Sequence, residues 1–243
     1  MGPMTSGKSE LLVNAVLALR RLSIPCLVGV SALLGKQEVR TRSRCVPTQQ
    51  FPADFVVPYQ GSGKTYQQLL VAAASTVGVV VVIVDEAQFL TVVEVQEFWR
   101  ITQVVAVQYG GEIRIVFAGL ARDSDRREFP GTIGVRTLPG CREFWLLATC
   151  SMCGNAASET GRFNFKTGVC LVQQSQIAVE GTKDIIYAPV CGAHYGQNLS
   201  PERLILLRAG VSPAEVDAFA FLPGLVRFLQ SSEAVPSGDV DDA

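Results

Sequence analysis

The chain has 243 residues, of which 48% are hydrophobic and 18% charged, so it is long enough for one large or two modest domains with a real core. Its net charge of −1, without a long basic run, argues against a nucleic-acid partner. No apolar run approaches the roughly 18 residues of a membrane span, and no signal sequence precedes the first motif. We therefore expect a cytoplasmic protein with no membrane partner, whose seven cysteines are thiols or metal ligands.

A phosphate-binding loop opens the chain. Residues 2–9 read GPMTSGKS and fit the pattern G-x-x-x-x-G-K-[ST]. In such a loop the backbone N–H groups point at a polyphosphate, Lys8 would reach the outer phosphates, and Ser9 would offer its hydroxyl to Mg²⁺. The similar stretch at 61–65 lacks the first glycine of the pattern, because Pro58 stands there, and we interpret it as a loop and a helix start.

Strands and helices alternate over the first 149 residues, which favours a parallel α/β sheet. The predicted helices are Lys8–Arg21 and Thr91–Tyr109, and the predicted strands are Pro25–Val30, Val79–Val84, Ile113–Leu120 and Phe144–Ala148. The run Val79–Val84 is apolar and mostly β-branched, and Asp85 and Glu86 follow it directly. Carboxylates at the carboxyl end of a buried strand stand where such sheets bind their ligands, so the two motifs together predict magnesium-dependent phosphoryl chemistry.

Two pairs of metal-ligand residues follow the α/β region. Cys150 and Cys153 form one C-x-x-[CH] knuckle, and Cys191 and His194, the only histidine of the chain, form the other. Two such knuckles close a tetrahedron around Zn²⁺, and four protein ligands leave no open position, so we expect a structural zinc site.

The pattern changes from alternating strands and helices to short hairpin-like pieces after Cys150, which sets the expected domain boundaries. We expect a nucleotide-binding domain over 1–149, a zinc-knuckle domain over 150–195, a helical extension over 196–232 and a disordered acidic tail over 233–243.

The order of these parts resembles the type II thymidine kinases. The resemblance rests on GPMxSGKS, the D-E-x-Q-F strand end, a G-L segment and the two zinc knuckles, and it runs from residue 2 to about residue 195. It implies an α/β fold with a P-loop NTPase-type parallel sheet of RecA-like order and a small zinc-binding lasso domain. It also implies a homo-oligomer, commonly a tetramer, that phosphorylates thymidine with ATP.

The resemblance assigns roles to residues by position. Glu86 matches the general base that takes the proton of the nucleoside 5′-hydroxyl; the alternative is a second magnesium-sphere ligand in a simple ATPase. Ser9 and Asp85 would hold Mg²⁺. The ATP-binding positions are Gly2, Pro3, Met4, Thr5, Ser6, Gly7, Lys8, Ser9, Asp85 and Gln88.

The family holds the base with a lasso strung between the two zinc knuckles, so the closed metal site anchors the loop that reads the substrate. The positions implied to contact the nucleoside are Met4, Phe89, Leu120, Ser124, Phe129, Thr160, Ile177, Ala178, Val179, Glu180, Gly181 and Tyr187.

Several residues depart from the family pattern. Ala121 replaces the usual Asp, and Ser124 stands where the family has a phenylalanine that stacks on the base. Loss of a stacking ring costs about 1–3 kcal/mol of base affinity by analogy with other base–aromatic stacks. Thr5 and Glu10 replace the usual phosphate-loop Phe and the Thr or Ser after Ser9. These changes spare the phosphoryl-transfer groups and weaken the nucleoside site.

A phosphate-binding loop ordinarily follows the central strand of the sheet, and only Met1 precedes Gly2 here. We expect either further residues upstream or a gap in the core that leaves the loop poorly anchored. Three functions stay open: a thymidine kinase, a catalytically degenerate kinase-like domain that stabilises or regulates an active partner, and a P-loop ATPase acting on nucleic acid. The last rests only on the alternating arginines Arg40, Arg42 and Arg44, which a solvated loop explains better.

Overall fold

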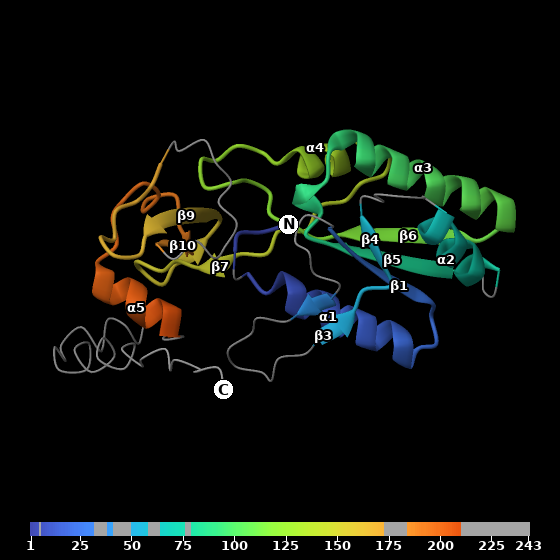
Figure 1. Ribbon diagram of the computed structural model, residues 1–243, viewed down its shortest axis with the longest axis horizontal. Coiled ribbons are helices and arrows are strands. Elements are labelled where there is room, and N and C mark those ends of the chain that lie inside the picture. The colour runs from blue at the N-terminus through green and yellow to red at the C-terminus, as the bar shows by residue number, and fades with distance from the viewer. Residues whose placement is uncertain are drawn as a thin grey trace, which may run out of the picture.

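The computed structural model describes residues 1–4, 6–31, 38–40, 50–57, 64–75, 79–172 and 184–209. A parallel sheet with its helices lies at one end of the long axis, and short antiparallel ribbons lie at the other (Figure 1). The amino terminus lies between these ends, so the phosphate-binding loop begins where they meet (Figure 1).

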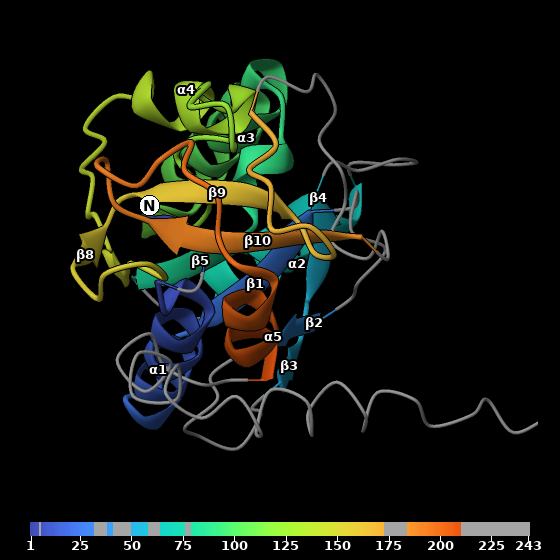
Figure 2. The same cartoon turned by 90° about the vertical axis from the view of Figure 1, so that its left-hand side faces the viewer.

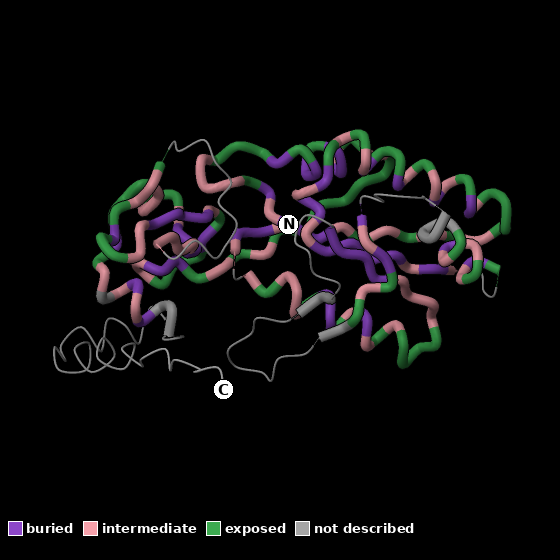
Figure 3. Tube along the Cα trace, in the orientation of Figure 1, coloured by how far each residue is buried: buried purple, intermediate pink, exposed green. Residues whose placement is uncertain are grey.

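Four strands form the parallel sheet in the order β4-β1-β5-β6, which confirms the expected α/β class. They are β1 (Cys26–Ser31), β4 (Phe55–Val57), β5 (Val79–Asp85) and β6 (Glu112–Phe117). The buried positions gather along the central strands (Figure 3), because parallel strands covered on both faces need apolar side chains on both. The register sets Val30 beside Asp85 and Val84 beside Phe117, so these strand ends share one edge.

Helices cover both faces of the sheet. The first, α1 (Lys8–Arg21), packs through Val13 and Val16 against Ile83 of β5. On the other face, α2 (Lys64–Ala74) and α3 (Val92–Tyr109) pack against Val80, Val82 and Val84. The period of two along β5 thus divides the apolar core into two clusters, one on each face.

The predicted helices begin and end close to the expected residues. The first is confirmed over Lys8–Arg21, and α3 begins one residue later than predicted, at Val92. Thr91 caps α3, because its hydroxyl accepts the Glu94 N–H while the Glu94 carboxylate accepts the Thr91 N–H. The short helix α4 (Pro130–Arg136) packs beside α3, and the 3₁₀ turn η2 (Ala87–Phe89) follows β5.

Short antiparallel ribbons follow the sheet, as the change of pattern after Cys150 predicts. In Figure 2 the ribbon of β9 (Glu159–Asn164) and β10 (Ile185–Val190) faces the viewer. A smaller ribbon pairs β7 (Ala148–Thr149) with β8 (Ala156–Ala157). A separate ribbon earlier in the chain, beside α1, pairs β2 (Glu38–Arg40) with β3 (Gln50–Pro52). The helix α5 (Pro201–Ala209) adds Leu204 to the cluster around Phe163.

The prediction of a strand over Phe144–Ala148 is wrong for all but its last residue, because only Ala148 lies in a strand. Residues 144–146 pair with Met1 instead: the Met1 amino group donates to the Phe144 carbonyl at 2.7 Å, and the Leu146 N–H donates to the Met1 carbonyl at 2.8 Å. Met1 therefore pairs with this segment as a residue of a parallel strand does, but the pairing extends over this one residue only. Phe144 is 76% and Trp145 44% exposed.

The strand expected ahead of the phosphate-binding loop is not supplied by any described residue, and within the described residues β6 pairs only with β5. The predicted strand Ile113–Leu120 ends at Phe117, because its neighbour β5 ends at Asp85 and the Ala118 carbonyl accepts the Ala87 N–H of the turn that follows. The predictions for residues 210–243 fall outside the described residues. Among the residues that the structure describes, no helix is long and apolar enough to span a membrane.

Candidate functional site

The phosphate-binding loop curves tightly into α1. Gly7 adopts a left-handed conformation with φ of 79°, which side-chain-bearing residues seldom take, and its carbonyl accepts the Leu11 N–H at 2.9 Å. The Lys8 ammonium turns back into the loop and donates to the carbonyls of Gly2, at 3.2 Å, and Pro3. It also lies 3.3 Å from the Ser6 hydroxyl. The loop therefore has the curvature of a phosphate cradle with its lysine inside; Thr5 falls outside the described residues.

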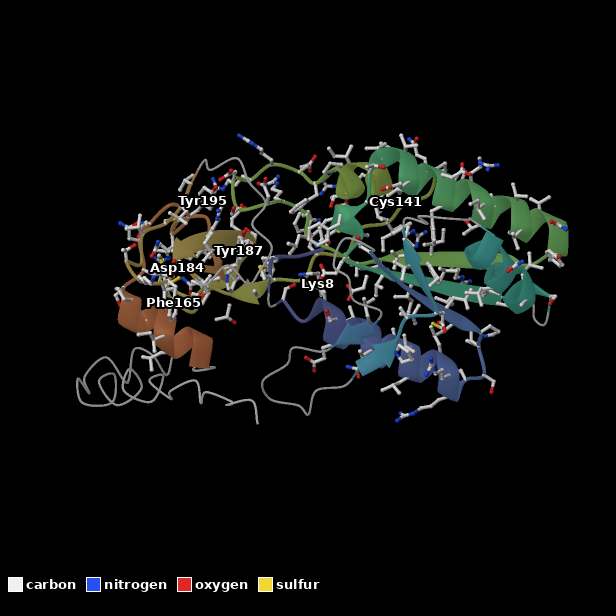
Figure 4. The ribbon with its side chains drawn as sticks, in the orientation of Figure 1. Lys8, Cys141, Phe165, Asp184, Tyr187 and Tyr195 are labelled. Carbon is white, nitrogen blue, oxygen red and sulfur yellow. The ribbon has the colours of Figure 1, made fainter. Side chains whose placement is uncertain are left out.

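Lys8 and two carboxylates share this site. Burial lowers the pKa of the Lys8 ammonium to about 8, while the charges of Glu86 and Asp85 act in the opposite direction. Figure 4 shows Lys8 at the end of the sheet that faces the ribbons. Burial disfavours the charged form of Lys8, and an anionic phosphate beside it would stabilise that charge.

The two carboxylates stand at the end of β5. Asp85 is buried, and its Oδ1 accepts the Glu86 N–H at 2.9 Å. Glu86 has a left-handed backbone with φ of 56°, a conformation that costs energy for a residue with a side chain and that clusters at functional sites. The Ala87 N–H donates to the Ala118 carbonyl at 2.8 Å and fastens this turn to the end of β6.

Gln88 bridges the ends of β5 and β6 with its carboxamide. The Nε2 group donates to the Glu86 Oε2 at 2.6 Å, and the Oε1 accepts the Leu120 N–H at 3.1 Å. The side chain is only 2% exposed. Gly119 is required beside it, because a Cβ at residue 119 would lie 2.4 Å from the Gln88 Oε1.

Five of the positions predicted to contact a nucleoside fall into three groups. Phe89 and Phe129 meet edge to face with centroids 6.2 Å apart, beside α4. Leu120 follows β6, and its carbonyl accepts the Thr132 hydroxyl at 2.8 Å. Thr160 on β9 accepts the Met4 N–H at 3.2 Å, which joins the ribbon to the phosphate-binding loop.

Two predicted nucleoside positions lie elsewhere and one stretch is not described. Tyr187 stands on β10 opposite Arg162 of β9, on the ribbon side of the molecule (Figure 4). Ser124 stands on the loop Arg122–Glu128, whose ends pair with each other. The lasso stretch Ile177–Gly181 lies outside the described residues.

The two knuckles bring Cys150, Cys153, Cys191 and His194 together, with all four ligand atoms within 4.8 Å of one another. The Cys153 and Cys191 sulfurs lie 3.9 Å apart, and the His194 Nδ1 lies 3.7 Å from the Cys150 Sγ. Ligand bonds of 2.0–2.3 Å in a tetrahedron give edges of about 3.5–3.8 Å, so the donor set fits zinc. These residues could hold a metal ion.

Hydrogen bonds within the cluster prepare one ligand for metal binding. Burial by itself raises the pKa of the Cys150 thiol, but N–H groups of Met152, Cys191 and Cys153, together with His194, outweigh it and lower the pKa to about 6. Thiolates are the form that binds metals, so this sulfur is ready as a ligand at neutral pH. Arg203 of α5 donates to the carbonyls of Ser151 and Met152, both at 2.8 Å, and thereby connects α5 to the turn between Cys150 and Cys153.

Sequence reasoning missed a set of contacts between the ribbons and the loop Arg122–Glu128. Tyr195, directly after the last metal ligand, donates its hydroxyl to the Ser124 carbonyl at 2.6 Å. Arg126 lies over the Tyr195 ring, 3.8 Å from its centroid, and its Nε lies 3.7 Å from Glu159. No local pattern reveals these pairs, because their members are far apart in the sequence.

A family model described as thymidine kinase matches residues 1–195. No curated protein matches the chain.

Proposed function

Because this chain belongs to the thymidine kinase family, we propose that it transfers the γ-phosphate of ATP to the 5′-hydroxyl of thymidine or deoxyuridine. The observation that carries the proposal is the meeting of the phosphate-binding loop with the Asp85–Glu86 turn, where both carboxylates act on the pKa of Lys8. A triphosphate cradle beside a carboxylate that can reach an incoming hydroxyl is the arrangement that phosphoryl transfer needs.

The residues divide the reaction between them. The loop N–H groups and Lys8 bind the triphosphate, and Ser9 and Asp85 would hold Mg²⁺, which neutralises charge on the phosphate oxygens. Glu86 accepts the proton of the 5′-hydroxyl as that oxygen bonds to the γ-phosphorus. The bond from the γ-phosphorus to the bridging oxygen breaks, and ADP leaves with the electron pair.

The cysteine and histidine cluster has a structural part in this proposal. Its four ligands would close the coordination sphere of a zinc ion, so a bound metal would organise the ribbons and would offer no open position for the reaction. The hydrogen bond between Met4 and Thr160 of β9 ties the ribbon to the phosphate-binding loop and supports Thr160 as a nucleoside contact. Tyr187 on β10 takes its role from the family resemblance alone.

We extend the proposal to the molecule as a whole, on the family resemblance. It is a cytoplasmic homo-oligomer, commonly a tetramer, with a nucleotide-binding domain over 1–149, a zinc-knuckle domain over 150–195 and a helical extension after it. Light scattering on the purified chain measures the assembly state directly.

A second candidate is a degenerate kinase-like domain that stabilises or regulates an active partner. Ser124 favours this candidate, because it carries no ring to stack on a base and its carbonyl already accepts a hydrogen bond from the Tyr195 hydroxyl. Ala121, in place of an acidic residue, is buried. On this reading the phosphate-binding loop still binds nucleotide, but the nucleoside site does not.

Radiolabelled phosphate transfer from ATP to thymidine tests the proposal, with wild type, Glu86→Gln and Glu97→Gln side by side. Glu97 pairs with Arg100 on the exposed surface of α3, so its variant is the matched control. We expect transfer by the wild type and the control, and a kcat about 10²–10⁴-fold lower in Glu86→Gln. No transfer by a folded, zinc-loaded wild type that binds ATP would refute the kinase and favour the degenerate domain.

A further inference from the structure

We propose that Gln88 is a positioning residue that fixes the carboxylate of Glu86 and ties it to the backbone at Leu120, and that it is not an ATP ligand. The inference rests on the proposed function, in which Glu86 accepts the proton of the nucleoside hydroxyl. It replaces the role that the family resemblance implies for Gln88.

The burial of Gln88 is the first argument. Its side chain is 2% exposed, and its described hydrogen bonds run from the amide nitrogen to Glu86 and from the Leu120 N–H to the amide oxygen. A carboxamide buried to this extent has almost no surface left for a nucleotide, whereas both of its ends already have protein partners.

The conformation of Glu86 is the second argument. Its side chain has three rotatable bonds, and Glu86 lies after the last residue of β5 with a left-handed backbone, so the regular strand does not set the direction of the carboxylate. The 2.6 Å bond from the Gln88 amide to the Oε2 is short, as expected for an amide that donates to an ionised oxygen. Among the described residues this bond occupies Oε2 alone, and Oε1 is the oxygen proposed to accept the proton of the incoming hydroxyl.

The connection to Leu120 is the third argument. The same carboxamide accepts the Leu120 N–H, and the Leu120 carbonyl accepts the Thr132 hydroxyl of α4. Gly119 leaves the space that this contact requires, because any Cβ there would overlap the Gln88 oxygen. Gln88 therefore fixes the position of the Glu86 carboxylate, at the end of β5, relative to the backbone of Leu120, after β6.

Gln88→Leu tests the role, since leucine occupies a similar volume without hydrogen bonds. Gln96→Leu on the exposed surface of α3 is the matched control. We expect kcat to fall roughly 10- to 100-fold in Gln88→Leu, as for other small displacements of a reacting group, with ATP affinity and KM for ATP within about twofold of wild type. Weaker ATP binding with kcat unchanged would overturn the proposal, because that is the signature of an ATP ligand.

A double-mutant cycle separates action through Glu86 from a general structural effect. If Gln88 acts through this carboxylate, the Glu86→Gln, Gln88→Leu double variant loses no more kcat than Glu86→Gln alone. Effects that multiply would overturn the proposal.

Gln88→Glu separates the two ends of the carboxamide. On the alkaline side of the pH profile, where both carboxyl groups are ionised, a carboxylate at residue 88 still accepts the Leu120 N–H but has no proton to donate to Glu86. The kcat measured there should therefore fall at least as far as in Gln88→Leu while the Leu120 contact survives. Full activity in Gln88→Glu would overturn the proposal. This variant also carries the test if Gln88→Leu does not fold.

Amide hydrogen exchange at Leu120 makes the inference independent of the kinase activity. We expect exchange at Leu120 to accelerate about tenfold or more in Gln88→Leu and to stay near wild type in Gln88→Glu. A wild type that transfers no phosphate but shows this pattern would refute the proposed function and keep the Gln88 connection. Unchanged exchange in Gln88→Leu would refute the connection itself.

Discussion

The hydroxyl of Tyr195 donates to the carbonyl of Ser124 at 2.6 Å and joins the turn that carries Cys191 and His194 to the loop Arg122–Glu128. Arg126 of that loop lies over the Tyr195 ring, and Arg122 and Arg126 both approach Glu159 of β9. The metal cluster is therefore tied to the sheet side of the molecule through one tyrosine as well as through the ribbons.

Tyr195→Phe removes this hydrogen bond and keeps the ring. We expect the free energy of unfolding to fall by about 0.5–1.5 kcal/mol, the usual net value of one hydrogen bond, and trypsin to cut faster after Arg126 and Arg127. Tyr109→Phe at the exposed end of α3 should stay within about 0.5 kcal/mol of wild type. Equal stability and equal cleavage in the two variants would show that the Tyr195 contact does not hold the loop.

Zinc content provides the second prediction. Sulfur-rich donor sets select zinc over magnesium, so the purified protein should contain about one zinc per chain by elemental analysis. Cys153→Ser should contain almost none, whereas Cys141→Ser, an exposed cysteine outside the cluster, should match the wild type. Full zinc content in Cys153→Ser would contradict the site.

The shifted pKa of Lys8 provides the third prediction. Lysine in an unfolded chain titrates near 10.4. Burial brings the Lys8 pKa to about 8 in the folded protein, so between these values the unfolded state holds more protons. The free energy of unfolding of the nucleotide-free protein should therefore rise as pH increases from about 8 to about 10. Below pH 8 Lys8 is protonated in both states, so it should contribute no change of stability with pH.

Triphosphate binding reverses this shift, because negative charge beside the ammonium raises its pKa. At pH 8.5 we expect uptake of up to about one proton per bound ATP, measured by calorimetry in buffers of different ionisation enthalpy, and little uptake by this group at pH 6.5. Lys8→Arg should lose the uptake, since arginine stays charged, and Lys166→Arg, in an exposed pair with Asp184, should keep it. Uptake at pH 8.5 that persists in Lys8→Arg would assign the proton to another group.

Local patterns were enough to predict the elements that carry the site. The β-branched run Val79–Val84 predicts its strand because burial on both faces demands such residues, and the glycine and lysine of the phosphate-binding loop predict the start of α1. Cysteine spacing predicts the cluster because a knuckle is a local turn, and the two knuckles meet as expected.

The remaining features depend on contacts between distant residues. Phe144–Leu147 has the composition of a strand, yet within the described residues it pairs only with Met1, and a strand forms only where a neighbouring strand meets it. The Gln88–Leu120 bond likewise joins residues from two different strand ends, which no spacing rule connects. The roles of Ile177–Gly181 stay a prediction from resemblance.

The pairing of Met1 with Phe144 and Leu146 has a practical consequence for anyone who produces this protein. The Met1 nitrogen that donates to the Phe144 carbonyl is the atom to which any preceding residue is joined, so a tag fused there would begin at the contact with residues 144–146. Because this pairing is parallel, residues ahead of Met1 would run beside Glu143 and Arg142, where a leader of strand-forming residues would lengthen the pairing, whereas a glycine and serine leader would leave this edge unpaired and open to self-association. The choice of leader is thus a choice about solubility.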